Sequence, residues 1–232
     1  MRAAVILFPG LNAETEMARA LRLVCAAEVT TVWHTDAALP KDVDLVAIPG
    51  GFSYGDYLRC GAIAKVSPIG SAIRAHAEAG GFVLGVCNGF QILTEMGLLP
   101  GALTRNLQLR FECRDITVRV DAEGPFSPTP GTRLTLPIAH AEGRYTASDE
   151  LVAALEKEGR IALRYADDTG ASTNRANPNG SVSNIAGIYG GPKKNILGLM
   201  PHPERAVEPN MGSTSGAHIF KAIRDHVQHG NA

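Results

Sequence analysis

Short apolar runs alternate with amphipathic stretches through the N-terminal part of the chain. The runs have the length of buried β-strands and cover residues 3–8, 29–33, 45–48 and 82–84. Apolar side chains recur at helical spacing between them, in residues 13–24 and 67–79, and again in residues 90–96. Strands that alternate with helices form a parallel sheet with helices on both faces. This part of the chain therefore predicts an open, mostly parallel α/β sheet.

Two of these helices carry start signals. Asn12 is placed to cap a helix over residues 13–24, and Glu14 and Glu16 complement the positive end of that helix. The pair Ser67-Pro68 combines a capping residue with a proline at the first helical position. We therefore expect the two helices to begin at these points.

The pattern changes after residues 97–101, where Gly-Leu-Leu-Pro-Gly ends the last amphipathic stretch. Strand-like pieces follow at residues 113–120, 133–137, 161–165, 185–189 and 195–200. Helical periodicity returns at residues 150–158 and 215–226. No Pro/Gly/Ser-rich linker divides the 232 residues. The sequence thus predicts a single domain over residues 1–232, with an additional antiparallel β portion in its C-terminal half.

Composition and charge limit the classes of binding partner that this chain is expected to have. A net charge of -1 and 45% hydrophobic residues are ordinary for a globular protein, without the basic excess that nucleic acid or an anionic membrane attracts. We expect a small molecule or another protein instead. The apolar run at residues 3–8 is too short for a signal peptide or a membrane span, which favours a cytoplasmic location.

Residues 85–89, Gly-Val-Cys-Asn-Gly, have the form of a nucleophile elbow. They join an apolar run to an amphipathic stretch, so a strand is expected to turn sharply into a helix with Cys87 at the apex. Glycines two positions before and after the apex avoid a collision with the neighbouring backbone. The helix N-terminus favours the nucleophilic thiolate. We therefore predict Cys87 as a nucleophile.

The other three cysteines lack this frame. Cys25 and Cys113 adjoin apolar residues and are expected in the core, whereas the role of Cys60, near a glycine-rich loop, stays open. No Cys-x-x-Cys spacing occurs, which argues against a disulfide framework and against a zinc site. No phosphate-binding or dinucleotide-binding glycine pattern occurs either. We expect neither a metal nor a cofactor in this chain.

His202 and Glu204 are the candidate partners of Cys87, because a cysteine nucleophile needs a base and a group that orients the base. In an extended segment, residues two apart face the same side, so both side chains can reach one site while Pro203 points away. An isolated His-x-Glu pair is more often a strand end followed by a surface acid. The remaining histidines lack supporting chemistry and are expected at the surface or as capping residues: His34, His76, His140, His218, His226 and His229.

An acyl-transfer site also needs N–H donors for the developing oxyanion. Gly50 and Gly51 follow the apolar run at residues 45–48, and the amide of Asn88 follows the candidate nucleophile. Both groups fall at carboxyl ends of predicted strands, where open sheets of this kind bind ligands. Taken alone, two glycines would indicate no more than a turn.

Together these segments resemble the triad-type (class I) glutamine amidotransferases. The matching segments are residues 49–52, 85–91 and 201–204. The resemblance runs through nearly the whole chain and narrows to the glutaminase subunits of phosphoribosylformylglycinamidine synthases, in residues 51–59, 177–181, 184–187 and 200–206. It implies a flavodoxin-like fold and the glutaminase component of a carbon–nitrogen ligase.

The resemblance also implies a mechanism. Cys87 would attack the side-chain amide of glutamine, His202 would protonate the departing ammonia, and Glu204 would complete the triad. Water would then hydrolyse a glutamyl thioester on Cys87. The other site residues that the resemblance implies are the oxyanion donors Gly51 and Asn88 and the substrate contacts Phe52 and Gln91.

Partners follow from the same resemblance. Ammonia would pass to a synthetase subunit that uses ATP and magnesium to convert formylglycinamide ribonucleotide to formylglycinamidine ribonucleotide in purine biosynthesis, together with a small third subunit. Two alternatives stay open. One is a redox-sensing or deglycase-type protein of flavodoxin-like fold with an elbow cysteine, and the other is a regulatory subunit with a vestigial triad.

Overall fold

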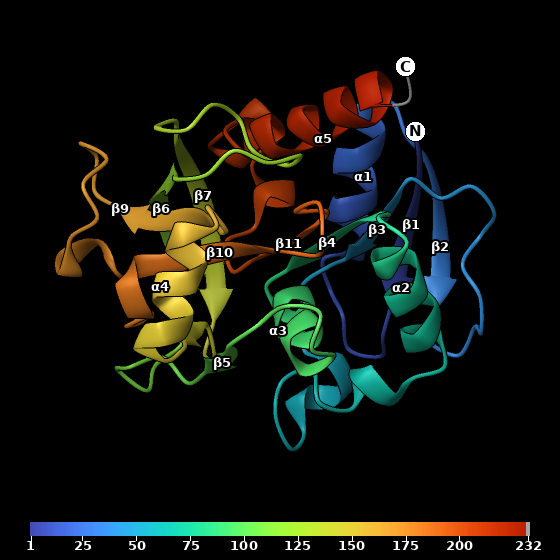
Figure 1. The fold of residues 1–232 in the computed structure, drawn as a ribbon, viewed down its shortest axis with the longest axis horizontal. Coiled ribbons are helices and arrows are strands. Elements are labelled where there is room, and N and C mark those ends of the chain that lie inside the picture. The colour runs from blue at the N-terminus through green and yellow to red at the C-terminus, as the bar shows by residue number, and fades with distance from the viewer. Residues whose placement is uncertain (231–232) are drawn as a thin grey trace.

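The computed structural model describes residues 1–230, and its main sheet has nine strands within them. The strands lie in the order β2-β1-β3-β4-β11-β10-β9-β6-β7 (Figure 1). Their bounds are β1 (Arg2–Leu7), β2 (Glu28–Trp33), β3 (Leu45–Ile48), β4 (Phe82–Val86), β6 (Glu112–Val120), β7 (Arg133–His140), β9 (Ile161–Ala166), β10 (Ile185–Gly190) and β11 (Ile196–Leu199).

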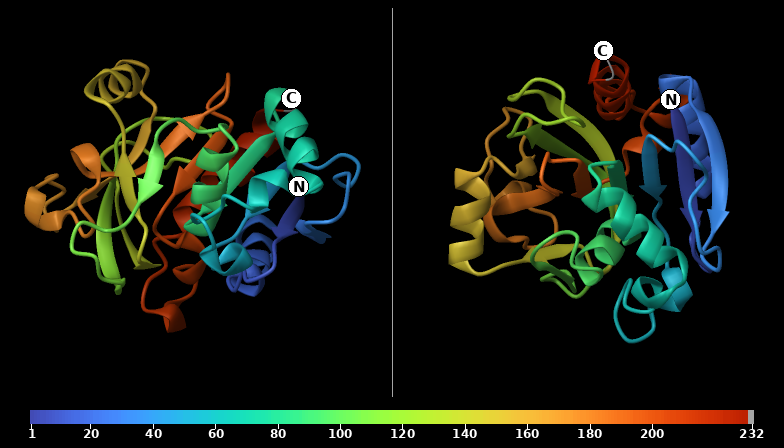
Figure 2. Two further views of the ribbon diagram at one scale, coloured as in Figure 1. Left: turned by 90° about the horizontal axis from the view of Figure 1, so that it is seen from below. Right: turned by 45° about the vertical axis from the view of Figure 1, so that its right-hand side comes forward.

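The sheet has a parallel and an antiparallel part. Strands β2, β1, β3, β4 and β11 run parallel to one another. Strands β10, β9, β6 and β7 continue the same sheet with antiparallel pairing, and Figure 2 shows this part extending from the parallel strands. The predicted open sheet with an additional antiparallel portion in the C-terminal half is confirmed.

Helices cover both faces of the parallel part. Helix α1 (Glu14–Cys25) packs against α5 (Ala217–Gly230) on one face, and α2 (Ile69–Glu78) and α3 (Asn88–Glu95) lie on the other (Figure 1). Helix α4 (Asp149–Lys157) lies beside the antiparallel strands. Every residue of β3 and of β11 is buried, as expected of central strands covered on both sides.

The predicted helix caps Asn12 and Ser67 are both wrong. Neither α1 nor α2 has a side-chain hydrogen bond at its N-cap. The Asn12 side-chain oxygen accepts instead from Arg205 at 3.5 Å, and the Ser67 and Tyr54 hydroxyls are hydrogen bonded at 2.8 Å. Both side chains therefore form hydrogen bonds with residues distant in the sequence instead of capping their helices.

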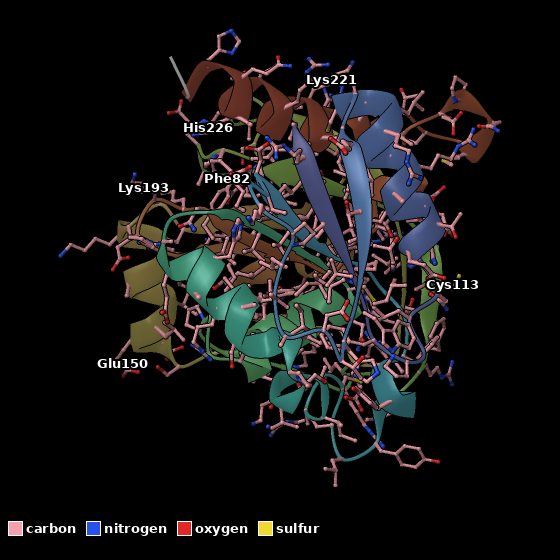
Figure 3. All side chains as sticks on the ribbon, turned by 90° about the vertical axis from the view of Figure 1, so that its right-hand side faces the viewer. Phe82, Cys113, Glu150, Lys193, Lys221 and His226 are labelled. Atoms are coloured by element: carbon pink, nitrogen blue, oxygen red, sulfur yellow. The ribbon has the colours of Figure 1, made fainter. Side chains whose placement is uncertain are left out.

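The structure also places two cysteines clearly. Cys25 is buried as predicted, and its thiol donates to the Phe220 carbonyl at 3.3 Å. Cys113 is exposed, so its prediction as a core residue is wrong (Figure 3). It lies in the first half of β6, where inward-facing residues begin only at Ile116.

A second, two-stranded antiparallel sheet joins β5 (Ala102–Thr104) to β8 (Arg144–Thr146). Its strands have three residues each and were not predicted. Over residues 1–230, none of the helices has both the length and the apolar character needed to cross a membrane.

Candidate active site

The carboxyl ends of β3, β4 and β11 lie side by side and bring three segments together. In the parallel register, Ile48 pairs with Gly85 and Leu199 pairs with Val86. Cys87 follows β4 directly, and its N–H donates to the Leu199 carbonyl at 2.8 Å. The glycines after β3 and the His-x-Glu segment after β11 therefore reach the same edge of the sheet as Cys87.

Cys87 has the strained backbone of a nucleophile elbow. Its φ of 52° and ψ of -106° lie outside the regions that L-residues favour, at a cost of about 1–3 kcal/mol. A Cβ on Gly89 would lie 2.0 Å from the Ile48 carbonyl oxygen, and one on Gly85 would lie 2.7 Å from the Gly89 carbonyl oxygen. The predicted need for glycine at both positions is confirmed.

His202 and Glu204 form a buried pair next to this elbow. His202 Nδ1 lies 2.5 Å from Glu204 Oε1, and the two side chains are 2% and 0% exposed. They are not joined by the extended segment that we expected. A 3₁₀ turn over Pro203–Arg205 follows His202 and folds Glu204 back toward the imidazole.

The environment of His202 favours the imidazolium ion. Burial opposes the charged ring, but interactions with the Glu204 carboxylate and with Cys87 outweigh it and raise the pKa of His202 to about 10. A Cβ on Gly50 would lie 2.6 Å from His202 Cε1 and 3.3 Å from Cys87 Cβ, so the two side chains flank one glycine. His202 Nε2 has no hydrogen-bond partner within residues 1–230. The charged ring thus holds an N–H available for transfer beside Cys87.

Gly51 and Asn88 are the backbone amides that the sequence predicted as oxyanion donors. Asn88 is the first residue of α3, where backbone N–H groups lack a partner inside the helix. Gly51 has a φ of 147°, and a Cβ there would lie 2.4 Å from Leu11 Cα, so the loop requires glycine at this point. Both residues adjoin Cys87, one in sequence and the other across the cavity wall.

A cavity of about 90 Å³ opens beside Cys87. It is lined by Gly51, Phe52, Asp56, Cys60, Cys87, Gln91, Ala139, His140, Ala141 and Glu142. The sequence-predicted residues Gly51, Phe52 and Gln91 therefore share one cavity with the candidate nucleophile. Phe52 is 44% exposed, which places it at the edge of the cavity toward solvent.

The side chains of Asn88 and Gln91 tie the walls of this cavity together. Asn88 accepts a hydrogen bond from the Ser53 N–H at 3.0 Å and donates to Gln91 Oε1 at 2.7 Å. Gln91 Nε2 donates in turn to the Glu142 carbonyl at 2.6 Å. The loop after β3, helix α3 and the segment after β7 are thus held in one arrangement.

Cys60 lines the same cavity without the properties of a nucleophile. Burial and the nearby carboxylates of Asp56 and Glu142 raise the pKa of Cys60, so its thiol stays neutral. Burial also raises the pKa of Asp56. Within residues 1–230, no group of three or more His, Cys, Asp or Glu side chains is arranged to hold a metal ion.

His140 is the site residue that the sequence did not identify. The expectation that it is a surface or capping residue is wrong, because it is buried and lines the cavity. Strand β7 continues through Pro137 to His140, since an edge strand tolerates a residue without an N–H. The alternation of Leu134, Leu136 and Ile138 toward the core, extended by two residues, would have placed His140 on the inner face.

Comparisons with known proteins identify the family of this chain. The CobB/CobQ-like glutamine amidotransferase domain family matches residues 1–224. The phosphoribosylformylglycinamidine synthase subunit PurQ of Bradyrhizobium diazoefficiens is 51% identical over 231 residues, which cover 98% of this chain and 99% of the relative. The subunit of the same name from Cereibacter sphaeroides is 52% identical over 226 residues, covering 96% of this chain and 97% of the relative.

Solved structures extend the comparison. A chain in the structure of PurLQS from Thermotoga maritima has a TM-score of 0.84 and 38% identity, covering 97% of this chain and 98% of that one. The glutaminase domain of CTPS from Trypanosoma brucei shares the fold, with a TM-score of 0.59 at 15% identity over 97% of this chain and 94% of that one. Similarity of this degree along nearly the whole length shows that the chain belongs to the glutamine amidotransferases and, among them, to the PurQ subunits of phosphoribosylformylglycinamidine synthase.

Proposed function

We propose that this chain hydrolyses glutamine to glutamate and ammonia within phosphoribosylformylglycinamidine synthase, through a triad of Cys87, His202 and Glu204. The observation that carries the proposal is the buried His202–Glu204 pair beside a cysteine at a strained strand-to-helix turn. Nucleophile, base and orienting acid are the three roles that covalent acyl transfer requires.

The first half-reaction forms a thioester. Cys87 Sγ attacks the side-chain carbonyl carbon of glutamine, and the backbone N–H groups of Gly51 and Asn88 donate hydrogen bonds to the resulting oxyanion. The imidazolium of His202 gives its Nε2 proton to the leaving nitrogen. The C–N bond breaks, and ammonia leaves a glutamyl thioester on Cys87.

The second half-reaction restores the enzyme. The neutral imidazole of His202 takes a proton from a water molecule, which attacks the thioester carbonyl carbon. The C–S bond breaks and glutamate leaves Cys87 as a thiolate beside the imidazolium. Glu204 keeps Nδ1 protonated and stabilises the positive charge in both halves. The chain itself supplies every group in this cycle, and we assign no cofactor to it.

Glutamine occupies the cavity of Cys87 in this proposal. Gln91 reaches the cavity from the first turn of α3, and Phe52 borders it on the solvent side. Both are assigned as substrate contacts.

The ammonia acceptor is a separate synthetase subunit that uses ATP and magnesium, accompanied by a small third subunit. Support for a docked partner comes from apolar side chains exposed on two loops that adjoin the cavity. These side chains are Phe52, Tyr57, Leu58, Leu107, Leu109 and Phe111. The first loop contributes Phe52 and Asp56 to the cavity wall, and Arg105 at the start of the second pairs with Glu142 at 3.5 Å. A partner on these loops would cover the cavity entrance.

Replacing the nucleophile in the assembled enzyme tests the proposal. Cys87→Ala is expected to abolish glutamine-dependent synthesis and to leave ammonia-dependent synthesis intact, because the synthetase chemistry lies in another subunit. Cys113→Ala, at an exposed cysteine, is the matched control and keeps both activities. Retention of glutamine-dependent synthesis by Cys87→Ala, or loss of both activities, would refute the division of roles.

A further inference from the structure

His140 is a second histidine in the cavity, and the proposed triad does not use it. It is 3% exposed and lines the cavity together with Cys87. The carbonyl oxygen of the preceding residue, Ala139, lies 3.8 Å from Cys87 Sγ. His140 therefore belongs to the segment that forms the cavity wall opposite Cys87.

Asn106 determines which nitrogen of His140 carries the proton. Asn106 Nδ2 donates to the carbonyls of His140 at 2.9 Å and Arg110 at 2.8 Å, and Asn106 Oδ1 accepts from the Gly143 N–H at 3.0 Å. His140 Nδ1 lies 3.1 Å from the same Oδ1. Because Oδ1 can only accept, Nδ1 must be the donor, and the neutral ring keeps its lone pair on Nε2.

The surroundings keep this ring uncharged. Burial and the positive charge of nearby His202 lower the pKa of His140 to about 4. The two histidines thus differ at neutral pH, with a cation at His202 and a neutral acceptor at His140. His140 Nε2 is buried and has no hydrogen-bond partner within residues 1–230. An unpaired buried acceptor costs about 1–3 kcal/mol, and a bound substrate can recover this energy.

We infer that His140 is a specificity-determining residue, whose Nε2 accepts an N–H of the glutamine side-chain amide and so favours an amide over a carboxylate. The inference rests on the proposed function. For attack, the amide carbon must lie about 3–3.5 Å from Cys87 Sγ, inside the cavity whose lining includes residues 139–142. In the proposal, the amide nitrogen faces His140 on that wall.

The same geometry disfavours glutamate. A carboxylate has no N–H to offer and would place an oxygen lone pair against the lone pair of Nε2. Sites built to hydrogen-bond a substrate N–H or O–H reject analogues that lack it, because the buried group of the protein then stays unpaired. His140 Nε2 would thus favour both the binding of glutamine and the release of glutamate.

The test compares His140→Leu with His140→Gln in the assembled enzyme. Leucine removes the acceptor, whereas glutamine can place Oε1 near the position of Nε2. The measured quantity is the inhibition constant for glutamate divided by the KM for glutamine, from glutaminase assays. We expect this ratio to fall about tenfold or more in His140→Leu and to be restored in His140→Gln to within about threefold.

Two controls separate the possible outcomes. Methyl methanethiosulfonate, a small uncharged thiol reagent, should modify Cys87 at the same rate in all variants if the site stays intact. If His140→Leu does not fold, His140→Asn, which retains a donor toward Asn106 and is too short to reach the position of Nε2, should show the same fall. An unchanged ratio, or equal losses for leucine and glutamine, would overturn the inference. A wild-type complex without glutaminase activity would instead refute the proposed function.

Discussion

Glu204 Oε1 lies 2.5 Å from His202 Nδ1, with both side chains withdrawn from solvent and joined by a 3₁₀ turn that follows His202. The carboxylate both fixes the orientation of the ring and stabilises its positive charge, against the cost of burial. In the proposed reaction, His202 moves the proton, whereas Glu204 acts only through His202. The two residues should therefore differ in what their loss costs.

Substitutions at this pair should reveal that difference. His202→Ala removes the proton donor and should lower kcat for glutamine hydrolysis by about 10³–10⁴. Glu204→Gln keeps a hydrogen-bonding group of the same size and should lower kcat by a smaller factor than His202→Ala does. Steady-state kinetics of the assembled enzyme distinguish the two. Equal losses would mean that Glu204 has a role beyond orienting and stabilising the ring.

The elbow makes a prediction about stability. A methyl group on Gly89 would meet the Ile48 carbonyl oxygen at 2.0 Å, and that backbone belongs to a buried central strand. Gly89→Ala should therefore lower the free energy of unfolding by about 3 kcal/mol or more. Denaturant titration followed by circular dichroism measures the change.

Gly97→Ala is the matched control for this measurement. Gly97 has a left-handed backbone, with a φ of 71°, but no atom lies within 4 Å of its added Cβ. It should cost about 1 kcal/mol, the strain of the left-handed conformation alone. Similar losses at the two positions would argue against a sterically enforced elbow.

The lowered pKa of His140 predicts that acid decreases the stability of the folded protein. An unfolded histidine titrates near pH 6.5, but the pKa of His140 in the folded protein is about 4. Between these values the unfolded chain binds more protons, so the free energy of unfolding decreases as pH falls from about 6.5 to 4. The full contribution of His140 is about 3 kcal/mol.

His140→Gln isolates this contribution, because glutamine does not titrate. Urea titrations of both proteins at pH 7 and pH 4 should show the wild type losing about 3 kcal/mol more than the variant over this range. The groups common to both proteins cancel in the comparison. A difference between the two proteins that stays constant with pH would show that His140 is not held neutral in the folded state.

Local pattern was sufficient for much of the fold and of the candidate site. The alternation of buried strands and helices predicted the parallel part, because burial on both faces leaves continuous apolar runs in the sequence. The glycines around Cys87 predicted the elbow, although the backbone that excludes a side chain at Gly89 belongs to Ile48 in the neighbouring strand β3. The spacing of His202 and Glu204 indicated their pairing, although a 3₁₀ turn rather than an extended segment produces it.

Long-range contacts account for what the sequence did not predict. Strand β5 has three residues, too few for a periodic pattern, and forms only by pairing with β8. The Ser67 hydroxyl forms a hydrogen bond with the Tyr54 hydroxyl instead of capping helix α2. The burial of His140 depends on a strand that continues past Pro137, which a central strand would not permit.

Labelling with a diazoketone analogue of glutamine tests the central claim most directly. The assembled enzyme would be treated with the analogue or with a generic alkylating agent, and the modified residue located by intact mass and peptide mapping. The proposed function predicts a single adduct on Cys87, which glutamine prevents. Modification of Cys87 by the generic reagent but not by the analogue would contradict a glutamine site and favour the redox-sensing or deglycase-type alternative.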